Sequence, residues 1–525
     1  MPKTRIVWSD GFVRVAPAYP AALKDELRYY SRFLEEDPET HRQVWQGRYR
    51  ECYQAGVGIA ADNTVEEWLV TYPGFMHRVK KALETAGWEY EVVDLRRPMP
   101  EPDWRSALSS LRDYQCECAW KAISSLGGVV ACPTGWGKTH IIAAIIKAFP
   151  HAELCLRNTP LVVLAGPDKD LARQNARRLK EYLPGRDVGL VSSDSHQFND
   201  DIQVCTLDSL NHVPMHEVGV LIIDEVHQAA TEDRAEVLSK AVNAKRWGAS
   251  ATPTGRYDGS DIVTEGLVGP IVYSRSYQEG IADGALVPIT VFWMAVPEPS
   301  IGLEAYRNYS SRKSKVDWGI EFNEGQRDLI VRLMRTIPDS MQTLCIMQHT
   351  AQMNALTEHL PGVRYVHACS DGKKLREMRQ YHLAPVKPAE RKGLYTQFRD
   401  GHIRKIMATY VYKQGVDFPE LQIMIQAGGG GSEIAAGQIP GRASRPQAGK
   451  DMSYLIEFHH PWDVEQTLDP ETHRLVKKVG PLLRDDRARS KVYEKLGFEQ
   501  YWITKPEELP FLGGQGPAKQ ELLPL

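Results

Sequence analysis

A phosphate-binding loop is indicated by the segment Cys132-Pro133-Thr134-Gly135-Trp136-Gly137-Lys138-Thr139. An apolar stretch predicted as a strand precedes this segment and an apolar stretch predicted as a helix follows it, which is the context that a P-loop requires. The glycines let successive backbone N–H groups point at the phosphates, while Lys138 can reach the β- and γ-phosphates and the Thr139 hydroxyl can bind Mg²⁺. The first glycine of the general pattern is replaced by Cys132. We therefore expect ATP to bind here with Mg²⁺, through Pro133, Thr134, Gly135, Trp136, Gly137, Lys138 and Thr139.

Two adjacent carboxylates stand at the end of a second apolar stretch, Leu221–Ile223, which is also predicted as a strand. In a P-loop protein, such a strand end is where the Mg²⁺-binding and water-activating groups belong. Asp224 is expected to hold Mg²⁺, directly or through water, and Glu225 is expected to polarise the attacking water. His227 completes the run Asp-Glu-Val-His, and we include it among the predicted catalytic residues.

The strands that position these residues belong to two series of short apolar stretches, which alternate with helical patterns from Leu111 onward. Buried strands that alternate with helices indicate parallel sheets, so we predict an α/β protein with two tandem parallel-sheet lobes. The first series comprises Gly128–Cys132, Leu161–Ala165, Ile202–Thr206, Val218–Ile223 and Trp247–Ala251. The second series comprises Thr343–Met347, Val363–His367, Ile406–Thr409, Ile423–Ala427 and Ser453–Phe458.

The predicted domain boundaries follow from these series and from a proline-rich linker at Arg96–Pro102. Residues 1–104 are predicted to form a small accessory domain that could bind DNA, with helical patterns at Pro20–Leu34 and Pro73–Ala86. Residues 105–288 form the ATP-binding lobe and residues 289–465 the second lobe. Residues 466–525 are expected to form a helical C-terminal tail.

Composition places few limits on the partners of this chain. The 525 residues include 64 basic and 67 acidic residues, so the net charge of −3 does not by itself indicate a nucleic-acid binder. No apolar run approaches the roughly 18–20 residues that cross a bilayer, and the N-terminus lacks the apolar region of a signal peptide. Eight scattered cysteines suit reduced thiols better than a disulfide framework. A soluble, cytoplasmic protein with no membrane partner is expected.

The motifs resemble, in their order along the chain, those of superfamily 2 helicases. This resemblance covers roughly residues 105–460, and it implies that both lobes have the RecA-like fold. Within the superfamily, Ser250-Ala251-Thr252-Pro253 with Arg256-Tyr257-Asp258-Gly259, and Gly284-Ala285-Leu286-Val287-Pro288, look most similar to the phage UvsW-type branch-migration and repair helicases. The motifs are Leu111-Arg112-Asp113-Tyr114-Gln115, Ala165-Gly166-Pro167-Asp168 with Leu171-Ala172-Arg173-Gln174, Cys205-Thr206-Leu207-Asp208-Ser209-Leu210, Asp224-Glu225-Val226-His227, Ser250-Ala251-Thr252, Ala408-Thr409 with Gln414-Gly415-Val416-Asp417-Phe418-Pro419, and Gln438-Ile439-Pro440-Gly441-Arg442-Ala443-Ser444-Arg445.

The resemblance implies roles for further residues. Phosphoryl transfer needs positive charge around the γ-phosphate, which Arg442 and Arg445 could supply from the second lobe, with Gln438 beside them. Arg112 and Gln115 would contact the adenine, Gly415 and Asp417 would help bind ATP and couple the two lobes, and the Ser250-Ala251-Thr252 motif would couple hydrolysis to movement. The implied nucleic-acid contacts are Pro167, Arg173, Gln174, Thr206, Thr409 and Lys413.

One long stretch of the sequence is clearly basic. Residues 364–413 contain twelve Lys or Arg and four Asp or Glu, and they include an excursion from Ser370 to Pro388. A basic loop at the rim of a nucleic-acid groove would contact phosphates, so Lys373 and Lys374 are further candidate contacts. The alternative is an ordinary solvated face, and the sequence leaves both open.

These features predict an ATP-dependent DNA helicase or translocase that acts on single-stranded, forked or branched DNA, as a monomeric motor. Contacts to the nucleic-acid backbone carry no base code, so the preference for DNA depends on the resemblance. Three alternatives stay open: an RNA-remodelling ATPase, the motor subunit of a restriction or defence complex, and an interaction protein with a decayed ATPase.

Overall fold

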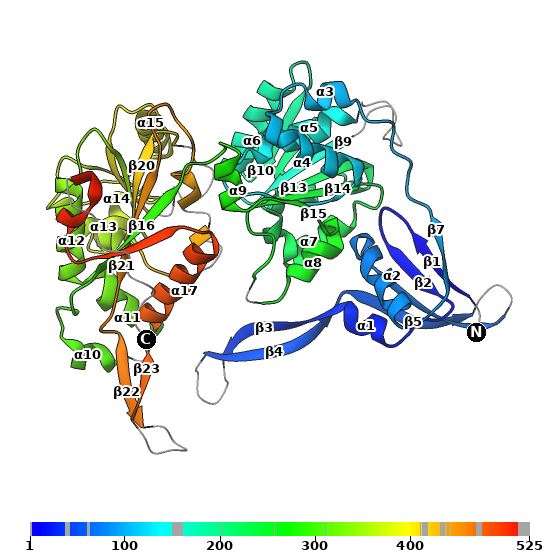
Figure 1. Cartoon of the computed structure of the whole chain (residues 1–525), viewed down its shortest axis with the longest axis horizontal. Helices are drawn as coiled ribbons and strands as arrows, with labels where there is room; N and C mark the ends of the chain where they lie inside the picture. Colours follow the sequence, from blue (N-terminus) through cyan, green and yellow to red (C-terminus); the bar gives the residue numbers. More distant parts are fainter. Residues whose placement is uncertain are drawn as a thin grey trace. The chain divides into compact units, whose positions relative to one another are not determined.

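The computed structural model describes residues 3–36, 43–59, 63–149, 161–199, 201–256, 258–309, 311–409, 411, 418–430, 436–437, 440–468 and 475–512. The chain forms two compact units, shown in Figure 1. Residues 1–133 and 137–275 make the first unit, and residues 134–136 and 276–525 make the second. The division at Arg275 and Ser276 lies near the predicted end of the ATP-binding lobe, and the N-terminal residues belong to the same unit as that lobe.

The N-terminal part of the first unit contains a five-stranded sheet in the order β5-β6-β2-β1-β7, together with a separate two-stranded ribbon. Only β1 and β7 pair in parallel in the larger sheet. The helix α2 (Met76–Thr85) confirms the predicted helical pattern, and it buries Val79 and Leu83. The strands of the sheet are β1 (Thr4–Trp8), β2 (Val13–Ala16), β5 (Tyr53–Ile59), β6 (Val65–Thr71) and β7 (Tyr90–Asp94), and the ribbon consists of β3 (Arg28–Glu36) and β4 (Gln43–Glu51).

The predicted helix at Pro20–Leu34 was wrong over its second half. The helix α1 (Ala22–Glu26) is short, and β3 begins two residues later and pairs with β4 along its full length. The run Tyr29-Tyr30-Ser31-Arg32-Phe33 is rich in aromatic residues, which favour strands once a partner strand is available.

The ATP-binding lobe in the first unit has an eight-stranded sheet in the order β11-β10-β12-β9-β13-β14-β8-β15. Each neighbouring pair is parallel except β10 and β11, which confirms the predicted parallel α/β lobe. The strands are β8 (Gly128–Ala131), β9 (Leu161–Gly166), β10 (Val188–Ser192), β11 (Ser195–Gln197), β12 (Ile202–Thr206), β13 (Val218–Asp224), β14 (Lys245–Ser250) and β15 (Ile271–Ser274). The helices are α3 (Trp104–Leu108), α4 (Asp113–Ser124), α5 (Lys138–Ala148), α6 (Lys169–Tyr182), α7 (Glu232–Ser239) and α8 (Asp261–Val268).

The second unit has a seven-stranded parallel sheet in the order β18-β19-β17-β20-β21-β16-β24. Its central strands β17 and β20 are almost wholly buried, as apolar strands covered on both faces should be. The strands are β16 (Ile289–Ala295), β17 (Gln342–Met347), β18 (Arg364–Val366), β19 (Lys405–Thr409), β20 (Leu421–Gln426), β21 (Ser453–His459) and β24 (Glu499–Ile503). The helices include α9 (Tyr277–Ala282), α10 (Leu303–Arg307), α11 (Arg312–Val316), α12 (Glu324–Thr336), α13 (Thr350–Thr357), α14 (Gly372–Glu377) and α15 (Pro388–Arg399).

The C-terminal tail is more than a helix. A hairpin of β22 (Val464–Leu468) and β23 (Leu475–Val479) precedes the helix α17 (Pro481–Lys495), and the strand β24 then joins the edge of the second sheet. Trp293 of β16 stacks on Trp502 of β24, with ring centroids 5.4 Å apart. The tail from residue 481 to Ile503 is therefore an integral part of the second lobe.

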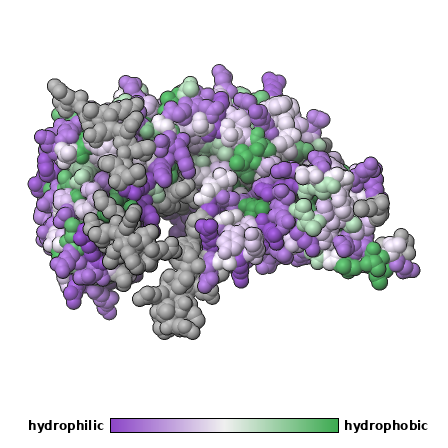
Figure 2. All heavy atoms as spheres, turned by 60° about the horizontal axis from the view of Figure 1, so that its bottom comes forward, coloured by the Kyte–Doolittle hydropathy of each residue, from purple (hydrophilic) through white to green (hydrophobic). Residues whose placement is uncertain are grey.

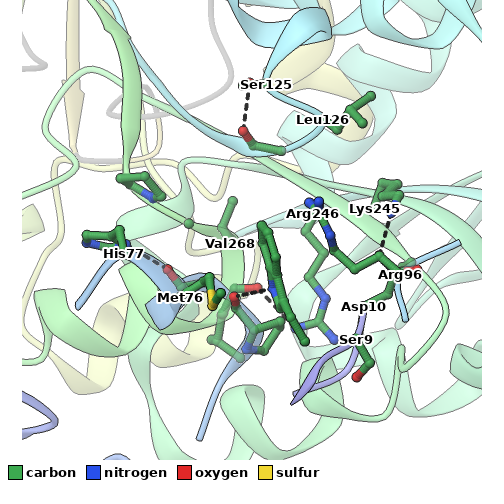
Figure 3. A pocket seen from close by; sticks show the side chains of 18 of the residues that line it. Ser9, Asp10, Met76, His77, Arg96, Ser125, Leu126, Lys245, Arg246 and Val268 are labelled. Atoms are coloured by element: carbon green, nitrogen blue, oxygen red, sulfur yellow. Dashed lines mark hydrogen bonds and ion pairs between the residues drawn. The ribbon is translucent and has the colours of Figure 1, made fainter. Parts of the chain in front are cut away.

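The N-terminal domain is fixed to the ATP-binding lobe by two ion pairs, one of them buried. Lys245 at the start of β14 donates to Asp10 at 2.6 Å, and both side chains are buried. Arg78 of α2 makes two hydrogen bonds of 2.7 Å to the Glu265 carboxylate of α8. Lys245 and Asp10 also line a cavity of about 320 Å³, together with Arg96 and Arg246 (Figure 3). These contacts make the N-terminal domain and the lobe one body.

Most of the surface seen in Figure 2 is hydrophilic. A hydrophobic group stands at its right-hand end, where Figure 1 places the tip of the β5–β6 hairpin. Val57, Ile59 and Val65 of this hairpin are each about 70% exposed, at 68%, 76% and 73%. Among the described residues, no helix is long and apolar enough to cross a membrane.

Candidate nucleotide-binding site

The P-loop lies between the end of β8 and the start of α5, as its sequence predicts. Gly137 has φ 104°, and a Cβ at this position would lie 2.3 Å from Nε2 of Gln115, so only glycine fits. The Lys138 ammonium donates to the carbonyls of Cys132 at 3.0 Å and Pro133 at 3.4 Å. The lysine thus lies folded over the loop, at the N-terminus of α5 where the helix dipole favours anions.

The N-terminal end of α4 packs against the P-loop. Gln115 is buried, and its Oε1 accepts a hydrogen bond of 3.1 Å from the backbone N–H of Arg112. Because the Gln115 amide lies against Gly137, it touches the backbone of the phosphate loop. Contact of Arg112 and Gln115 with adenine stays a prediction.

Three P-loop residues, Thr134 to Trp136, belong to the second unit. Trp136 is fully buried, and its indole N–H donates to the Asp283 carboxylate at 3.3 Å. The Oγ1 atom of Thr134 is buried and has no hydrogen-bond partner among the described residues. Gly135 has φ 91°, so this part of the loop also has the left-handed backbone that turns N–H groups toward a phosphate.

The two predicted carboxylates lie at the carboxyl end of β13. Asp224 is buried, accepts a hydrogen bond of 2.9 Å from Asn175 Nδ2, and accepts one of 3.0 Å from the backbone N–H of Glu225. Burial, and next the Glu225 carboxylate, raise the pKa of Asp224 above its ordinary value. Glu225 has φ 51°, a strained conformation for a residue other than glycine, of the kind that is enriched at functional sites.

These groups fit Mg²⁺. The cation prefers hard oxygen ligands, and the residues that could hold it are the Asp224 carboxylate and the Thr139 hydroxyl at the start of α5. A buried carboxylate whose pKa is raised by its neighbour gains most from a nearby cation, because the cation favours the ionised form. Asn175, which lies on α6 and orients Asp224, was not among the predicted site residues, because a buried Asn within an amphipathic helix gives only a weak signal.

A chain of hydrogen bonds joins Glu225 to the end of the neighbouring strand, β14. The Ser250 hydroxyl donates to Glu225 Oε2 at 3.4 Å, lies 2.9 Å from Nδ1 of His227, and accepts from the backbone N–H of Thr252 at 3.0 Å. Arg256 donates to the His227 carbonyl at 3.0 Å. The predicted catalytic Glu225 and His227 and the predicted coupling motif, Ser250 to Thr252, are therefore in one network, with Ser250 fully buried at its centre.

We predict that His227 stays neutral at physiological pH. Burial, and then the positive charges of Arg256 and Lys138, lower the pKa of His227 from 6.5 to about 4. Between these values the unfolded chain binds the proton that the folded chain rejects, so stability falls as the pH falls from 6.5 toward 4. Urea unfolding at pH 7.5 and at pH 5 measures this effect. Between the two pH values, the free energy of unfolding should fall by about 2 kcal/mol less in His227→Gln than in the parent chain. Equal losses in the two proteins would contradict this.

The candidate nucleic-acid residues of the first unit lie just after β9, on α6, and at the carboxyl end of β12. Pro167 is buried, and Arg173 of α6 forms ion pairs with Asp170 at 3.0 Å and with Asp194. The Thr206 hydroxyl is buried and donates to Ser209 at 2.8 Å. Gln174 lies half-buried next to Arg173 on α6. Their contact with nucleic acid stays a prediction.

In the second unit, the short helix η8 (Pro440–Arg442) carries the first predicted arginine. Arg442 is buried and Arg445 is half-buried. The turn between them is fixed, because the Ser444 hydroxyl donates to the Gly441 carbonyl at 2.7 Å and the Ser444 carbonyl accepts from the Val287 N–H at 2.7 Å. Thr409 ends β19 and is buried. Gln438, Gly415, Asp417 and Lys413 lie outside the described residues.

The basic excursion is folded. Its helix α14 and the following turn are attached by the buried side chains of Leu375, Leu383 and Val386, and the Val386 N–H donates to the Cys369 carbonyl at 3.0 Å. Lys373 and Lys374 are exposed on α14. The segment thus presents its positive charges on a defined scaffold.

Two family models match parts of this chain. Residues 108–255 match the family model described as "Type III restriction enzyme, res subunit", and residues 326–447 match the model described as "Helicase conserved C-terminal domain". Together the two matches cover just over half of the chain.

Two curated relatives extend over most of the chain. "DNA 3'-5' translocase XPB2" of Sulfurisphaera tokodaii is 26% identical over 372 residues, which are 66% of this chain and 80% of that protein. "DNA 3'-5' helicase XPB" of Mycobacterium tuberculosis is 24% identical over 458 residues, which are 80% of this chain and 74% of that protein.

Among solved structures, S. cerevisiae Dbp5 bound to RNA and ADP BeF3 superposes with a TM-score of 0.51 at 14% sequence identity. The match covers 77% of this chain and 93% of that chain. At this identity the likeness concerns the fold alone, and it confirms the tandem RecA-like lobes.

Proposed function

We propose that this chain, which belongs to the superfamily 2 helicases and is an ATP-dependent DNA helicase or translocase, remodels forked or branched DNA and moves along one strand from 3′ to 5′. The single observation that carries the proposal is the arrangement at three consecutive strand ends, β13, β14 and β8. They bring Asp224 and Glu225, the Ser250 hydroxyl and the P-loop to one edge of the sheet. Branched DNA is supported by the resemblance to UvsW-type helicases, and the direction by the names of the two relatives.

The proposed hydrolysis begins with ATP on the P-loop. Lys138, now bonded to two carbonyls of the loop, would turn to the β- and γ-phosphates, and the backbone N–H groups of the loop would bind phosphate oxygens. Mg²⁺ would neutralise part of the phosphate charge when bound. Glu225 would accept a proton from the attacking water, and Arg442 and Arg445 would stabilise the negative charge of the transition state.

The proposed coupling runs through Ser250. Its hydroxyl lies between Glu225 and His227, and its oxygen accepts from the N–H of Thr252, so a shift of Glu225 on hydrolysis changes the hydrogen bonds of the segment after β14. His227, held neutral by burial, can act as donor or acceptor without changing charge. The hydrogen bonds of Ser250 and His227 would therefore depend on whether the γ-phosphate is present, and this dependence would couple hydrolysis to the rest of the lobe.

ATPase assays with different nucleic acids test this function. Single-stranded DNA, forked DNA and a four-way junction should each stimulate ATP turnover more than duplex DNA or RNA. On partial duplexes, the chain should displace a strand when the loading tail has a free 3′ end, and fail with a 5′ tail. Stimulation by RNA but not by DNA would instead establish an RNA-remodelling ATPase.

The basic excursion provides a second prediction about DNA. If Lys373, Lys374, Arg376 and Arg379 contact phosphates, replacing all four with Gln should flatten the slope of log affinity against log salt. Each phosphate contact that is lost should change the slope by about 0.7–0.9. Basal ATPase activity should survive. Fluorescence anisotropy with single-stranded and forked DNA measures the slope, and an unchanged slope on both would assign the segment to a solvated outer face.

Substitution is a better experiment here than deletion of residues 371–387. The deletion would remove the buried side chains of Leu375, Leu383 and Val386 together with the charges. A loss of DNA binding could then reflect a damaged lobe. The four glutamines leave these apolar contacts in place.

A further inference from the structure

We propose that the outer face of the β3–β4 ribbon binds unpaired DNA bases by stacking them on Tyr30 and Tyr49. This inference rests on the proposed action on DNA, and it adds a binding site in the N-terminal domain. The proposal is based on a pair of exposed aromatic rings on a ribbon whose opposite face is fixed to the ATP-binding lobe.

The inner face of the ribbon is anchored. Ser31 is buried, and Tyr29 packs against the hydrophobic core of the first unit. Arg50 of β4 forms an ion pair with Glu232 at the start of α7. A Cβ at Gly259 would lie 2.9 Å from the Tyr30 carbonyl, so the ribbon backbone also touches the loop that follows the Ser-Ala-Thr motif. The base of the ribbon therefore moves with the ATP-binding lobe.

The outer face carries the aromatic pair. Tyr30 and Tyr49 are directly opposite each other in the ladder, with ring centroids 5.3 Å apart at an angle of 70°. They are 47% and 63% exposed. Gly47 makes room for the first ring, because a Cβ at Gly47 would lie 2.3 Å from the Tyr30 hydroxyl oxygen. Two adjoining exposed aromatic rings offer a surface on which a flat base can stack.

Two arginines lie on the same face as the aromatic pair, and Glu51 stands opposite the first of them. Side chains alternate along a strand, so Arg28 and Arg32 lie on the face of Tyr30. The Arg28 guanidinium lies 4.7 Å from the centre of the Tyr49 ring and pairs with Asp25 at 2.5 Å. Arg32 is exposed. An aromatic platform with arginines beside it is the arrangement that binds bases and phosphates together.

Unpaired DNA fits this face better than a duplex. The faces of paired bases are covered by their neighbours, whereas an unpaired base can stack on an exposed ring. The proposed contact lies at the base of the ribbon, where Tyr30 and Tyr49 face each other. The site would hold a few nucleotides of a single strand.

Replacing both tyrosines by alanine in the full chain tests the proposal. Tyr30→Ala/Tyr49→Ala should weaken binding of a short single-stranded DNA between about five-fold and a hundred-fold for each stacked base that is lost. Basal ATPase activity without DNA should be unchanged. The Tyr30→Phe/Tyr49→Phe protein keeps both rings and should bind like the parent chain. Anisotropy and quenching of a 2-aminopurine base are suitable measurements.

A matched control is available in the same domain. Val57→Ala/Ile59→Ala removes two exposed apolar side chains from the β5–β6 hairpin and should leave DNA binding unchanged. Equal binding by the parent and the double alanine protein would overturn the proposal, and so would equal losses on single-stranded and blunt duplex DNA. If DNA neither binds nor stimulates the parent chain, the proposed function fails instead, and the two failures are distinguishable.

Discussion

Glu225→Gln should retain ATP binding and lose turnover by about 10²–10⁴-fold, the range that a general base contributes. Glutamine is nearly isosteric and can still accept the hydrogen bond from the Ser250 hydroxyl, so the fold of the site should survive. It cannot take a proton from water. ATP affinity by calorimetry and phosphate release under saturating ATP separate the two effects.

A matched control is Glu236→Gln, which changes an exposed glutamate on α7 that pairs with Lys240 at 3.2 Å. This protein should hydrolyse ATP normally. Lys138→Ala should weaken both binding and turnover, because it removes the positive charge at the phosphates. Near-normal hydrolysis by Glu225→Gln would remove Glu225 from the proposed mechanism.

Arg442→Ala and Arg445→Ala should each lower turnover by about 10³-fold or more, with ATP affinity comparatively intact, by analogy with arginine fingers. The reason is that their charge would be needed where negative charge develops in the transition state and less in the ground state. Lysine at either position should restore little, because it lacks the planar fork that contacts two oxygens. The measurements are kcat for ATP with saturating DNA, and ATP affinity.

Arg404→Ala provides the comparison within the same unit. Arg404 pairs with Glu420 at 2.8 Å on the surface, and both side chains are about 40% exposed. Its loss should change turnover little. If Arg442→Ala and Arg445→Ala also hydrolyse ATP at the parent rate, the proposed role in phosphoryl transfer is excluded.

The sequence was a good guide wherever a local pattern decides the structure. Every strand predicted in the two lobes is present, because short apolar runs that alternate with helices are typical of parallel strands buried on both faces. The P-loop and Asp224 were predicted because phosphate binding demands particular residue types at fixed spacing. Their hydrogen-bond partners were harder to predict, because Asn175 contacts Asp224 only after distant segments have packed together.

The N-terminal domain shows the opposite case. β3 was predicted as a helix because its partner strand β4 begins only at Gln43, and local spacing carries no information about such pairing. The edge strand β24 was missed for a related reason: it is short, follows a helix, and pairs with a strand some two hundred residues earlier in the chain. Long-range pairing of this kind is decided by the assembled sheet.

The position of β24 has a consequence for biosynthesis. β16 opens the second lobe, yet one of its two neighbours in the sheet is β24, close to the end of the chain. Until residues from Glu499 onward have been synthesised, β16 has no strand paired to this edge and Trp293 has no stacking partner. An unpaired parallel edge is prone to aggregation, so the nascent second lobe should depend on chaperones until its last strand emerges.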